Sequence, residues 1–501
     1  MPEPGPITFI SQSGALGSAI LDWALTHHIG FSMFISLGSM LDIDFGDLID
    51  YLGEDPETRS ILIYMEGIDD IKRARKLMSA IRGFARTKPI LILKPGKYEA
   101  SARAAKSHTG AMVGSFEVYD AAFKRVGAIR VDEIEALIDV IAEKRKPVLT
   151  VWMGGSDEVR EARQLFSKND IPCYSTPEDA VKTYMYMYKY KWNLDLLYET
   201  PREISVDLSP PIHHLKVLIR RARREKRDVL LIDEAERFMK AYGIPTPEGG
   251  LAKSVGEAML IASKIGYPVV LKIVSPDIIH KVNVGGVITG IKNENELREG
   301  FNRLIQRIRE KMPEARIEGV YVQKMVTNTD YELIIGSKKD PIFGSVILFG
   351  AGGFGVELFK DYAIGLPPLN QVLARRLMEE TKIYRFLVKG YRNKPPVDIA
   401  KLEEILVRFS NMLVDFPEIK EVDINPLLVS RSEAWAVDVR IVLDHELGDR
   451  EPEQYSNLVI MPYPSKYIVP YRLRDGTQVI LRPIRPEDEP LEAEFIENLS
   501  E

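Results

Sequence analysis

The amino-acid sequence predicts an α/β protein with two successive flavodoxin-like, parallel-sheet domains and a mixed α+β domain after them. Over residues 1–143, short apolar runs rich in β-branched residues alternate with helical stretches. This alternation predicts a parallel sheet with helices on both faces. Residues 147–198 repeat the pattern in brief, and residues 228–447 combine strands and helices in an α+β pattern. The length of 501 residues agrees, because it is enough for about three or four domains.

The first two regions have clear strand and helix candidates. In the first, the strands are expected at Ile7–Ser11, Ser32–Leu37, Ser60–Met65 and Pro89–Leu93, and the helices include Ala15–Thr26 and Ile71–Thr87. In the second, strand Val148–Met153, a Gly-Gly turn, helix Glu158–Lys168 and strand Ile171–Tyr174 follow one another. Prolines spaced over Thr200–Pro211 indicate a linker to the third region.

The third region begins with a helix at Ile232–Tyr242. Its strands are expected at Pro268–Ile273, Gly286–Ile291, Gly319–Met325, Tyr331–Ser337, Ser345–Phe349 and Ala434–Val442. The last segment, Tyr471–Glu501, predicts a strand pair around Asp475-Gly476 and a helix just after Pro486. A hairpin and one helix cannot bury a core alone, so we expect the chain to end inside a further domain.

The composition restricts the class of protein. A net charge of -6 argues against wholesale binding of nucleic acid. The single cysteine, Cys173, excludes an intrachain disulfide and suits a reducing compartment. No apolar run is long enough to cross a bilayer, and the N-terminus lacks the pattern of a signal sequence. We therefore expect a cytoplasmic protein without nucleic-acid or membrane partners.

A Ser/Gly-rich turn, Ser11–Gly17, joins the first expected strand to a helix. Free backbone N–H groups and the positive end of the helix dipole would suit a phosphate there. An ordinary serine cap explains the same residues, and from the spacing alone it is the favoured interpretation.

Two titratable side chains in the first region are candidates for catalysis. Glu66 comes directly after strand Ile61–Met65, at the edge where open α/β sheets keep their active sites, although a solvent-facing loop acid is the alternative. His108 lies in a stretch of small residues, Ala100–Ala111, that permits close approach of an anion to the backbone. Its imidazole is nucleophilic when neutral near pH 7. A capping or surface histidine is the alternative, and it is our interpretation of His27, His28, His213, His214 and His445.

The third region has a candidate phosphate clamp and a candidate metal site. Lys272 ends an apolar strand near a glycine-containing loop, although a strand-end lysine that extends to solvent is common. Asn425 and Asp438 offer hard oxygen ligands from two adjacent expected strands, which suits Mg²⁺, whereas Asp-x-Asn-Pro can also be a simple turn. We interpret Arg220–Arg227 as a solvated helix face and Tyr184–Tyr190 as a packed helix.

Taken in order, these segments resemble the NDP-forming acyl-CoA synthetases, the group of ADP-forming acetyl-CoA synthetase that is related to succinyl-CoA synthetase. The resemblance covers about residues 5–447 and is carried by SQSGALG, LDIDFGDLIDYLGEDPETRSILIYMEG, SHTGA, YPVVLKIVSPDIIHKVNVGGV and EVDINPLLV. It implies a flavodoxin-type domain over 1–143, a second small ligase-like domain over 144–212 and an ATP-grasp domain over 226–447.

The resemblance also implies roles for particular residues. His108 would be a phosphohistidine supported by Glu66, and His280 would be the second histidine that carries phosphate between distant sites in the ADP-forming branch. Two helix N-termini would hold the phosphohistidine, through Ser11, Ser13, Gly14, Gly154, Gly155 and Ser156. The nucleotide would contact Lys272, Gln323, Lys324, Met325, Val326 and Glu332, and Mg²⁺ would bind Asn425 and Asp438.

The implied reaction interconverts acyl-CoA, ADP and phosphate with a carboxylic acid, ATP and CoA through the phosphohistidine. ATP or ADP, Mg²⁺ and CoA as co-substrate are the expected ligands, with a small carboxylic acid as substrate and an oligomer as the assembly. The family normally begins with a CoA-binding domain, which we expect on a separate subunit or flanking sequence. In addition, Gly38–Asp42 stands where the family has a Gly-Asn-Lys-x-Asp-like segment.

The final segment points to an alternative function. Residues Leu473–Asp488 resemble the opening of a GNAT-type acetyltransferase domain, here residues 463–501. Relatives of this kind would fuse a ligase-like body to a protein lysine acetyltransferase. The body would then be regulatory, and retention of His108, Glu66 and His280 favours the ligase over that alternative.

Overall fold

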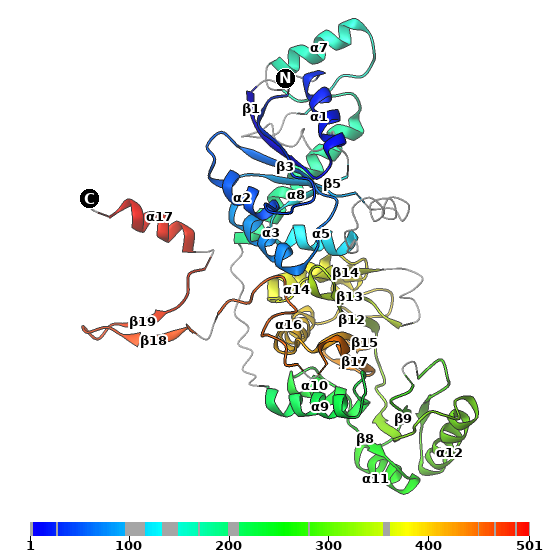
Figure 1. Ribbon diagram of the computed structural model, residues 1–501. Helices are drawn as coiled ribbons and strands as arrows, with labels where there is room; N and C mark the ends of the chain where they lie inside the picture. The colour runs from blue at the N-terminus through cyan, green and yellow to red at the C-terminus, as the bar shows by residue number, and fades with distance from the viewer. Residues whose placement is uncertain are drawn as a thin grey trace. The chain divides into compact units, whose positions relative to one another are not determined.

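The computed structural model describes residues 4–26, 29–95, 116–132, 149–168, 171–198, 210–278, 281–353, 361–448, 450–464, 467–485 and 488–499. The chain divides into two compact units (Figure 1). Unit 1 comprises Met1–Thr200, Asp340–Phe343 and Pro462–Glu501, and unit 2 comprises Pro201–Lys339 and Gly344–Met461. Among the described residues, no helix is long and apolar enough to cross a membrane.

Unit 1 contains the parallel sheet that the sequence predicts. Its strands are β1 (Pro4–Ser11), β2 (Phe31–Ser36), β3 (Ser60–Tyr64), β4 (Ile90–Leu93) and β5 (Ile129–Val131). They lie in the order β2-β1-β3-β4-β5, and each neighbouring pair is parallel. This is the flavodoxin-like order, in which the direction of winding reverses between β1 and β3. The four expected strands are confirmed to within three residues at their ends, and β5 is additional.

Helices flank this sheet, and in the second, third and fourth helices named below, buried apolar residues recur at helical spacing on one face. They are α1 (Gly14–Thr26), α2 (Phe45–Glu54), α3 (Ile71–Phe84), α5 (Phe116–Arg125) and, from the second region, α8 (Pro177–Tyr198). Ile20 of α1 and Tyr186 of α8 pack on one core cluster with Phe9 and Leu62 of the strands. The expected helix at Tyr184–Tyr190 is therefore present, but only one face of it packs, since Tyr184 and Tyr188 are exposed.

The second region is smaller than expected. Its described part contains β6 (Thr150–Val151), α7 (Asp157–Lys168) and β7 (Cys173–Tyr174), with β6 parallel to β7. The alternation and the strand direction are confirmed, but the two strands pair over only two residues each. Most of the expected linker lies outside the described residues, and the next helix, α9, spans Ile212–Arg224.

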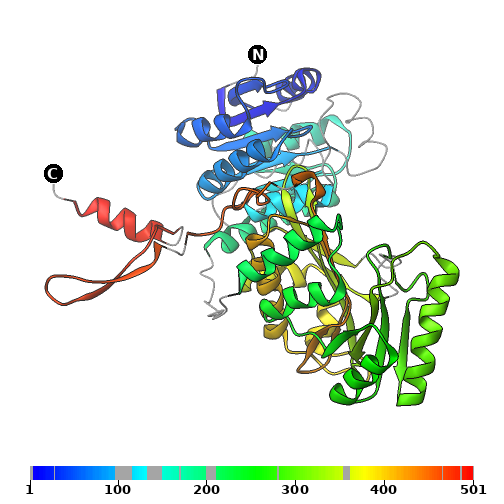
Figure 2. The same cartoon turned by 60° about the horizontal axis from the view of Figure 1, so that its bottom comes forward.

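Unit 2 has two sheets, and each has its own core. The small lobe consists of β8 (Gly249–Ala252), α11 (Val255–Ile265), β9 (Val269–Val274), β10 (Val287–Ile291), α12 (Glu294–Lys311) and β11 (Gly319–Lys324). Its antiparallel sheet has the order β10-β9-β11-β8. Both helices pack on the face that presents Leu271 and Val322 (Figure 2). Because side chains alternate along a strand, Lys272, Tyr321 and Gln323 belong to the opposite face.

The large lobe is built on the second sheet of unit 2. It consists of α9, α10 (Ile232–Ala241), β12 (Tyr331–Asp340), β13 (Gly344–Ala351), β14 (Tyr362–Gly365), α14 (Gln371–Glu379), α15 (Tyr384–Lys389), α16 (Ile399–Asp415), β15 (Ile419–Val429), β16 (Ala434–Ala436), β17 (Val439–Leu443) and the 3₁₀ helix His445–Leu447. The strands lie in the order β14-β13-β12-β15-β16, and β17 also pairs with β15. Residues of α10, α14 and α16 share one core with these strands.

Two predictions in the large lobe are wrong. The single strand expected at Ala434–Val442 is two strands, divided at Val437-Asp438. They pair with different parts of β15 on either side of Asn425-Pro426, and Pro426 has no N–H to continue the ladder. In the basic run, Arg227 is not solvated. It is 6% exposed and bonds both carboxylate oxygens of Glu234, because a buried guanidinium needs a paired charge.

The C-terminal segment has the expected elements. Strands β18 (Val469–Arg472) and β19 (Gln478–Leu481) form an antiparallel hairpin around Asp475-Gly476, and α17 spans Glu489–Glu497. Apolar side chains of this segment are largely exposed, including Ile480, Leu491 and Phe495.

Candidate active site

In unit 1, polar side chains meet at the carboxyl edge of the parallel sheet. Gln12 follows β1, Glu66 follows β3, and Lys94 follows β4. These three strands are neighbours and run in the same direction, so the three residues lie side by side. Gln12 and Glu66 stand where the winding reverses, which is where open α/β sheets bind ligands. The predicted place of Glu66 at a sheet edge agrees with this geometry.

Gln12 fixes the backbone that carries Glu66. Its Oε1 accepts the N–H of Glu66 at 2.5 Å and the N–H of Gly67 at 3.1 Å. Its Nε2 donates to the carbonyl oxygen of Gly67 at 3.1 Å. These contacts hold the loop after β3 in one conformation and leave the half-buried carboxylate of Glu66 free for another partner. Our sequence analysis did not select Gln12, although its place directly after a buried strand is a signal of this role.

Lys94 is a second residue that the sequence analysis did not select. It is 4% exposed, its Nζ donates to the carbonyl oxygen of Pro95 at 3.0 Å, and it lies 4.9 Å from the centroid of the Tyr119 ring. Burial lowers the pKa of Lys94 to about 8, and the negative charge of Glu66 opposes that shift. The charge of Lys94 therefore interacts with that of Glu66 at the same edge of the sheet, without a direct ion pair within 4 Å between these two described residues.

The two Ser/Gly turns act as helix caps. Oγ of Ser13 accepts the N–H of Leu16 at 3.3 Å at the start of α1, and Oγ of Ser11 accepts the N–H of Ser13 at 3.1 Å. A side chain at Gly14 would meet nothing within 4 Å, so the backbone there is open. Oγ of Ser156 caps α7 by accepting the N–H of Val159 at 3.4 Å.

The second turn, Gly154–Ser156, is exposed. Gly154 has a φ of +124°, which favours glycine, and a side chain at Gly155 would meet nothing within 4 Å. In the described part of the chain, no hydrogen bond or ion pair connects Gly154–Ser156 with Glu66 or with the turn at Ser11–Gly14. His108 and His280 lie outside the described residues.

In unit 2, lysines of the small lobe meet Asp438 of the large lobe. Lys272 is 5% exposed, and its Nζ donates to the carbonyl oxygen of Val437. Oδ1 of Asp438 lies 3.9 Å from Nζ of Lys272 and 3.6 Å from Nζ of Lys281. Burial lowers the pKa of Lys272, and Asp438 opposes the shift. The division between β16 and β17 therefore matters, because it turns Val437 and Asp438 toward Lys272.

Asn425 and Glu332 extend the same cluster. The N–H of Asn425 donates to the carbonyl oxygen of Asp438 at 3.2 Å, and its Oδ1 accepts the N–H of Gly353 at 3.1 Å. A Cβ on Gly353 would lie 1.9 Å from Oε2 of Glu332, so only glycine permits this carboxylate to approach. The predicted residues Lys272, Asn425, Asp438 and Glu332 are thus brought together by the strands that the structure describes.

The segment Gln323–Val326 leaves the small sheet at the end of β11. Nε2 of Gln323 donates to Oε1 of Glu236 at 2.8 Å. Nζ of Lys324 donates to the carbonyl oxygens of Gly266 and Tyr267. Glu236 also accepts the hydroxyl of Tyr321, and this carboxylate and burial together raise the pKa of Tyr321, so the hydroxyl keeps its proton. Neither Glu236 nor Lys281 was selected as a site residue from the sequence.

The donor set at Asp438 and Asn425 fits Mg²⁺. Oδ1 of Asp438 is buried without a hydrogen-bond donor, and both residues offer the oxygen ligands that Mg²⁺ prefers. Among the described residues, no group of three or more His, Cys, Asp or Glu side chains could hold a metal by itself. A set of only two protein ligands is typical of a Mg²⁺ site in which the other ligands are oxygens of nucleotide phosphates and water.

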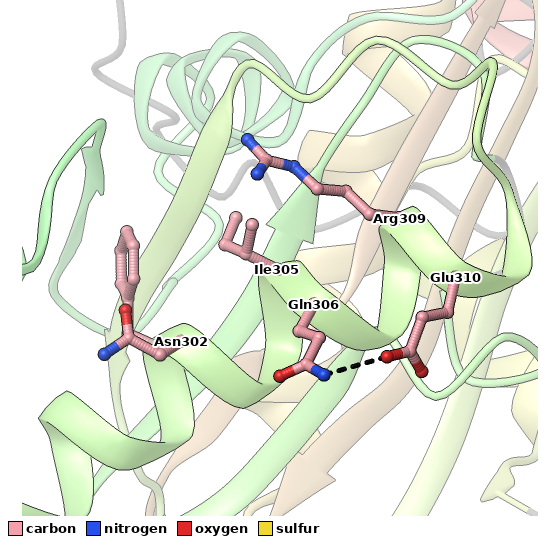
Figure 3. Close-up of a pocket in the computed structure, with 6 residues that line it drawn as sticks. Asn302, Ile305, Gln306, Arg309 and Glu310 are labelled. Carbon is pink, nitrogen blue, oxygen red and sulfur yellow. Dashed lines mark hydrogen bonds between the residues drawn. The ribbon is translucent and has the colours of Figure 1, made fainter.

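A hollow of about 390 Å³ lies elsewhere, along α12. Its walls are all side chains of this one helix, as Figure 3 shows, and Gln306 bonds Glu310 across one turn at 2.8 Å. None of the predicted site residues lines it. We therefore assign no part of the active site to this hollow.

The chain thus combines a flavodoxin-like parallel sheet that has a polar carboxyl edge with a two-lobed domain that has a lysine–carboxylate cluster. Family models agree: residues 4–143 match the succinyl-CoA ligase like flavodoxin domain, and residues 221–443 match the ATP-grasp domain. The chain is 33% identical to acetate–CoA ligase [ADP-forming] I of Archaeoglobus fulgidus, in an alignment that covers 89% of this chain and 79% of that protein. The chain belongs to the ADP-forming acetyl-CoA synthetase family.

Further relatives have related activities. The 4-hydroxybutyrate–CoA ligase [ADP-forming] of Nitrosopumilus maritimus is 31% identical, over 88% of this chain and 78% of that protein. Among solved structures, a chain of acetyl-coenzyme A synthetase 1 of Ca. Korarchaeum cryptofilum, in complex with coenzyme A and Ca-AMPCP, is 40% identical. The match covers 46% of this chain and 99% of that chain, with a TM-score of 0.44.

Proposed function

We propose that this chain is an NDP-forming acyl-CoA synthetase that interconverts acyl-CoA, ADP and phosphate with a carboxylic acid, ATP and CoA through a phosphohistidine. The observation that carries the proposal is the Glu66 carboxylate, held by Gln12 at the point where the winding of the parallel sheet reverses. The same chain has an ATP-grasp domain with a lysine–carboxylate cluster, which supports a relay of phosphate between two sites.

In the flavodoxin-type domain, His108 is the proposed nucleophile. Glu66 would accept a hydrogen bond from the imidazole nitrogen that is not phosphorylated, which fixes the orientation of the ring. Two helix N-termini would donate backbone N–H groups to the phosphoryl oxygens. The residues proposed at these two turns are Ser11, Ser13, Gly14, Gly154, Gly155 and Ser156.

In the ATP-grasp domain, the small lobe would hold the phosphates and the base. Lys272 is a point charge suited to a phosphate, and Glu332 lies in the same cluster. The proposed hinge that contacts the nucleotide base comprises Gln323, Lys324, Met325 and Val326. Asn425 and Asp438 are the proposed ligands of Mg²⁺, which when bound neutralises charge on the transferring phosphate. The lysines at Asp438 can then pair with phosphate oxygens.

The proposed reaction has three balanced transfers. Phosphate oxygen attacks the thioester carbon, the C–S bond breaks, and acyl phosphate and CoA thiol form. Nitrogen of His108 then attacks the phosphorus, the acyl P–O bond breaks, and the carboxylate leaves. In the last transfer the P–N bond to His108 breaks as nitrogen of His280 takes the phosphoryl group, and the P–N bond to His280 then breaks as the β-phosphate oxygen of ADP attacks the phosphorus. Each transfer keeps a high-energy phosphoryl or acyl bond, so the sequence is reversible.

The partners follow from this chemistry. The proposed domains are 1–143, 144–212 and 226–447, and the CoA-binding domain would come from a separate subunit or flanking sequence, in an oligomer. A small carboxylic acid is the proposed substrate, in line with the acetate and 4-hydroxybutyrate in the names of the relatives. The single cysteine supports a reducing cytoplasmic setting.

A second candidate function concerns the C-terminal segment. Residues 463–501 would be the beginning of a GNAT-type acetyltransferase domain, for which the ligase-like body would be regulatory. The observation in line with it is the antiparallel hairpin β18–β19 followed by α17, the order of elements that this resemblance implies.

The experiment that tests the proposed function is phosphohistidine labelling. The protein is incubated with γ-labelled ATP and Mg²⁺, and acid-labile, base-stable label is measured. We expect full label on the wild type and on His214→Ala, an exposed histidine of α9, and clearly less on His108→Ala, in which only His280 can accept the phosphate. Equal labelling of wild type and His108→Ala would rule out the proposed nucleophile. His280→Ala is expected to slow labelling of His108.

A further inference from the structure

Glu236 is a buried carboxylate on α10 for which the proposed reaction has no role. It is 2% exposed. Its Oε2 accepts the hydroxyl of Tyr321 at 2.5 Å, and its Oε1 accepts Nε2 of Gln323 at 2.8 Å. Nζ of Lys240 lies 3.4 Å from Oε2, but Lys240 is about half exposed, so this ion pair contributes little. The two neutral donors of β11 are therefore the main compensation for burying this charge.

The carboxylate connects the two lobes of the ATP-grasp domain. α10 is anchored in the large lobe, where Ala235, Phe238 and Met239 belong to its core. Tyr321 and Gln323 belong to β11 of the small lobe, on the face opposite its helices. Ile232 of α10 adds an apolar contact with Val274 and Tyr321 next to the carboxylate. One side chain of the large lobe thus holds the strand that leads into the proposed base-binding hinge.

The same contact determines which way the Gln323 amide points. An ionised carboxylate only accepts hydrogen bonds, so the NH₂ group of Gln323 must face Glu236 and the amide oxygen must face away from it. The next residues are held as well: the N–H of Met325 donates to the carbonyl oxygen of Pro268 at 3.0 Å. The donors and acceptors at the end of β11 are therefore fixed before a nucleotide binds, which lowers the ordering cost of binding.

We propose that Glu236 is a positioning residue for the nucleotide base, acting through Gln323 and Tyr321. This inference rests on the proposed nucleotide-binding role of the ATP-grasp domain. Loss of the carboxylate frees the Gln323 amide to rotate and loosens the small lobe against α10. Both affinity for the nucleotide and discrimination between adenine and guanine then decrease.

The test measures binding of Mg-ADP and Mg-GDP by titration calorimetry, together with the melting temperature. We expect Glu236→Ala to weaken Mg-ADP binding by about tenfold or more, and to bring the affinities for Mg-ADP and Mg-GDP closer together. Glu236→Gln, which can still accept one hydrogen bond, is expected to recover part of both effects. Tyr321→Phe keeps the ring and removes one donor, so it should fold and give a smaller loss than Glu236→Ala.

Glu403→Ala is the matched control. Glu403 is also buried, and it also accepts an amide N–H of glutamine, from Gln371 at 2.9 Å, and a second donor, from Arg375 at 2.5 Å. It lies on α16, so its loss should lower the melting temperature without changing base preference. If Glu403→Ala and Glu236→Ala alter base preference equally, or if Glu236→Ala leaves it unchanged, the positioning role is wrong. A wild type that binds neither nucleotide contradicts the proposed function instead.

Discussion

Several charged side chains of this protein are buried, and each interacts with a polar or charged group. Nζ of Lys94 donates to the carbonyl oxygen of Pro95, Nζ of Lys272 lies 3.9 Å from Oδ1 of Asp438, and Glu236 accepts hydrogen bonds from Tyr321 and Gln323. Burial of a charge costs free energy unless a hydrogen bond or an opposite charge offsets it. Groups with perturbed pKa values concentrate at functional sites for this reason. Among these side chains, Lys94 leads to the prediction that is most directly tested at the scale of a single residue.

The stability of the protein should depend on pH through Lys94. Its pKa is about 8 in the folded protein and 10.5 without burial. Between these values the unfolded state binds more protons, so the contribution of Lys94 to the free energy of unfolding increases as pH rises, by ~3 kcal/mol at most. Below about pH 8 both states are protonated, and the contribution is constant and unfavourable.

Urea titrations at about pH 7.5 and about pH 9.5 measure this dependence. We expect the wild type to gain ~1–2 kcal/mol over this interval relative to Lys94→Met, because the variant has no titrating group there. Lys72→Met, at an exposed position of α3, serves as control and should follow the wild type. Identical pH dependence of wild type and Lys94→Met would contradict the lowered pKa.

At the scale of elements, α2 and α3 show how local signals and packing combine. α2 begins with a capping box in which Asp44 accepts the N–H groups of Gly46 and Asp47, and Asp47 accepts the N–H of Asp44. These signals are local in sequence. The close contact between the two helices is not local: a Cβ on Gly53 of α2 would lie 2.2 Å from the Phe84 ring of α3.

The same substitution should therefore have opposite effects in the two helices. Gly83→Ala in α3 is expected to raise the free energy of unfolding by about 0.5–1 kcal/mol, because a side chain there meets nothing within 4 Å and alanine favours the helix. Gly53→Ala is expected to lower it by about 1–3 kcal/mol, because the Phe84 ring must move. Urea denaturation measures both. A gain in stability for Gly53→Ala would show that the helices separate easily.

The elements also show what sequence patterns can predict. Four strands of the parallel sheet were predicted to within three residues, because a buried parallel strand is a short apolar run with β-branched residues, whereas the short β5 was missed. The division of β16 from β17 was missed, because it depends on which part of β15 each strand pairs with. Arg227 was assigned to a solvated face because its partner Glu234 is visible only once the chain turns between α9 and α10.

At the scale of the whole molecule, the chain consists of two compact units with different chemistry. Unit 1 contains the Gln12–Glu66 edge, and unit 2 contains the Lys272–Asp438 cluster. The core cluster of unit 1 around Phe9 and Leu62 shares no residue with the core clusters of unit 2, so we expect the two units to unfold in separate cooperative transitions. A ligand stabilises only the part of a protein that binds it.

Mg-ADP should therefore shift only one of two thermal transitions. We expect scanning calorimetry of the intact chain to show two transitions, and Mg-ADP at about a hundred times its Kd to stabilise the transition of unit 2 by ~2.7 kcal/mol. Asp438→Ala should remove most of that shift, whereas the transition of unit 1 should stay unchanged. A single transition that shifts as a whole would show that the units unfold together.

The sequence by itself determined the fold class, the order of the domains and the residue types of the candidate site. These depend on local periodicity and on motifs that lie in a fixed order along the chain. His108 and His280 stay predictions from those motifs, outside the described residues. Only the tertiary structure showed that Gln12 accepts a hydrogen bond from the backbone of Glu66, 54 residues away, and that Glu236 accepts one from Gln323, 87 residues away. Such contacts depend on the order of the strands in a sheet and on the helix that packs between two sheets. The spacing of residues along the chain specifies neither of these.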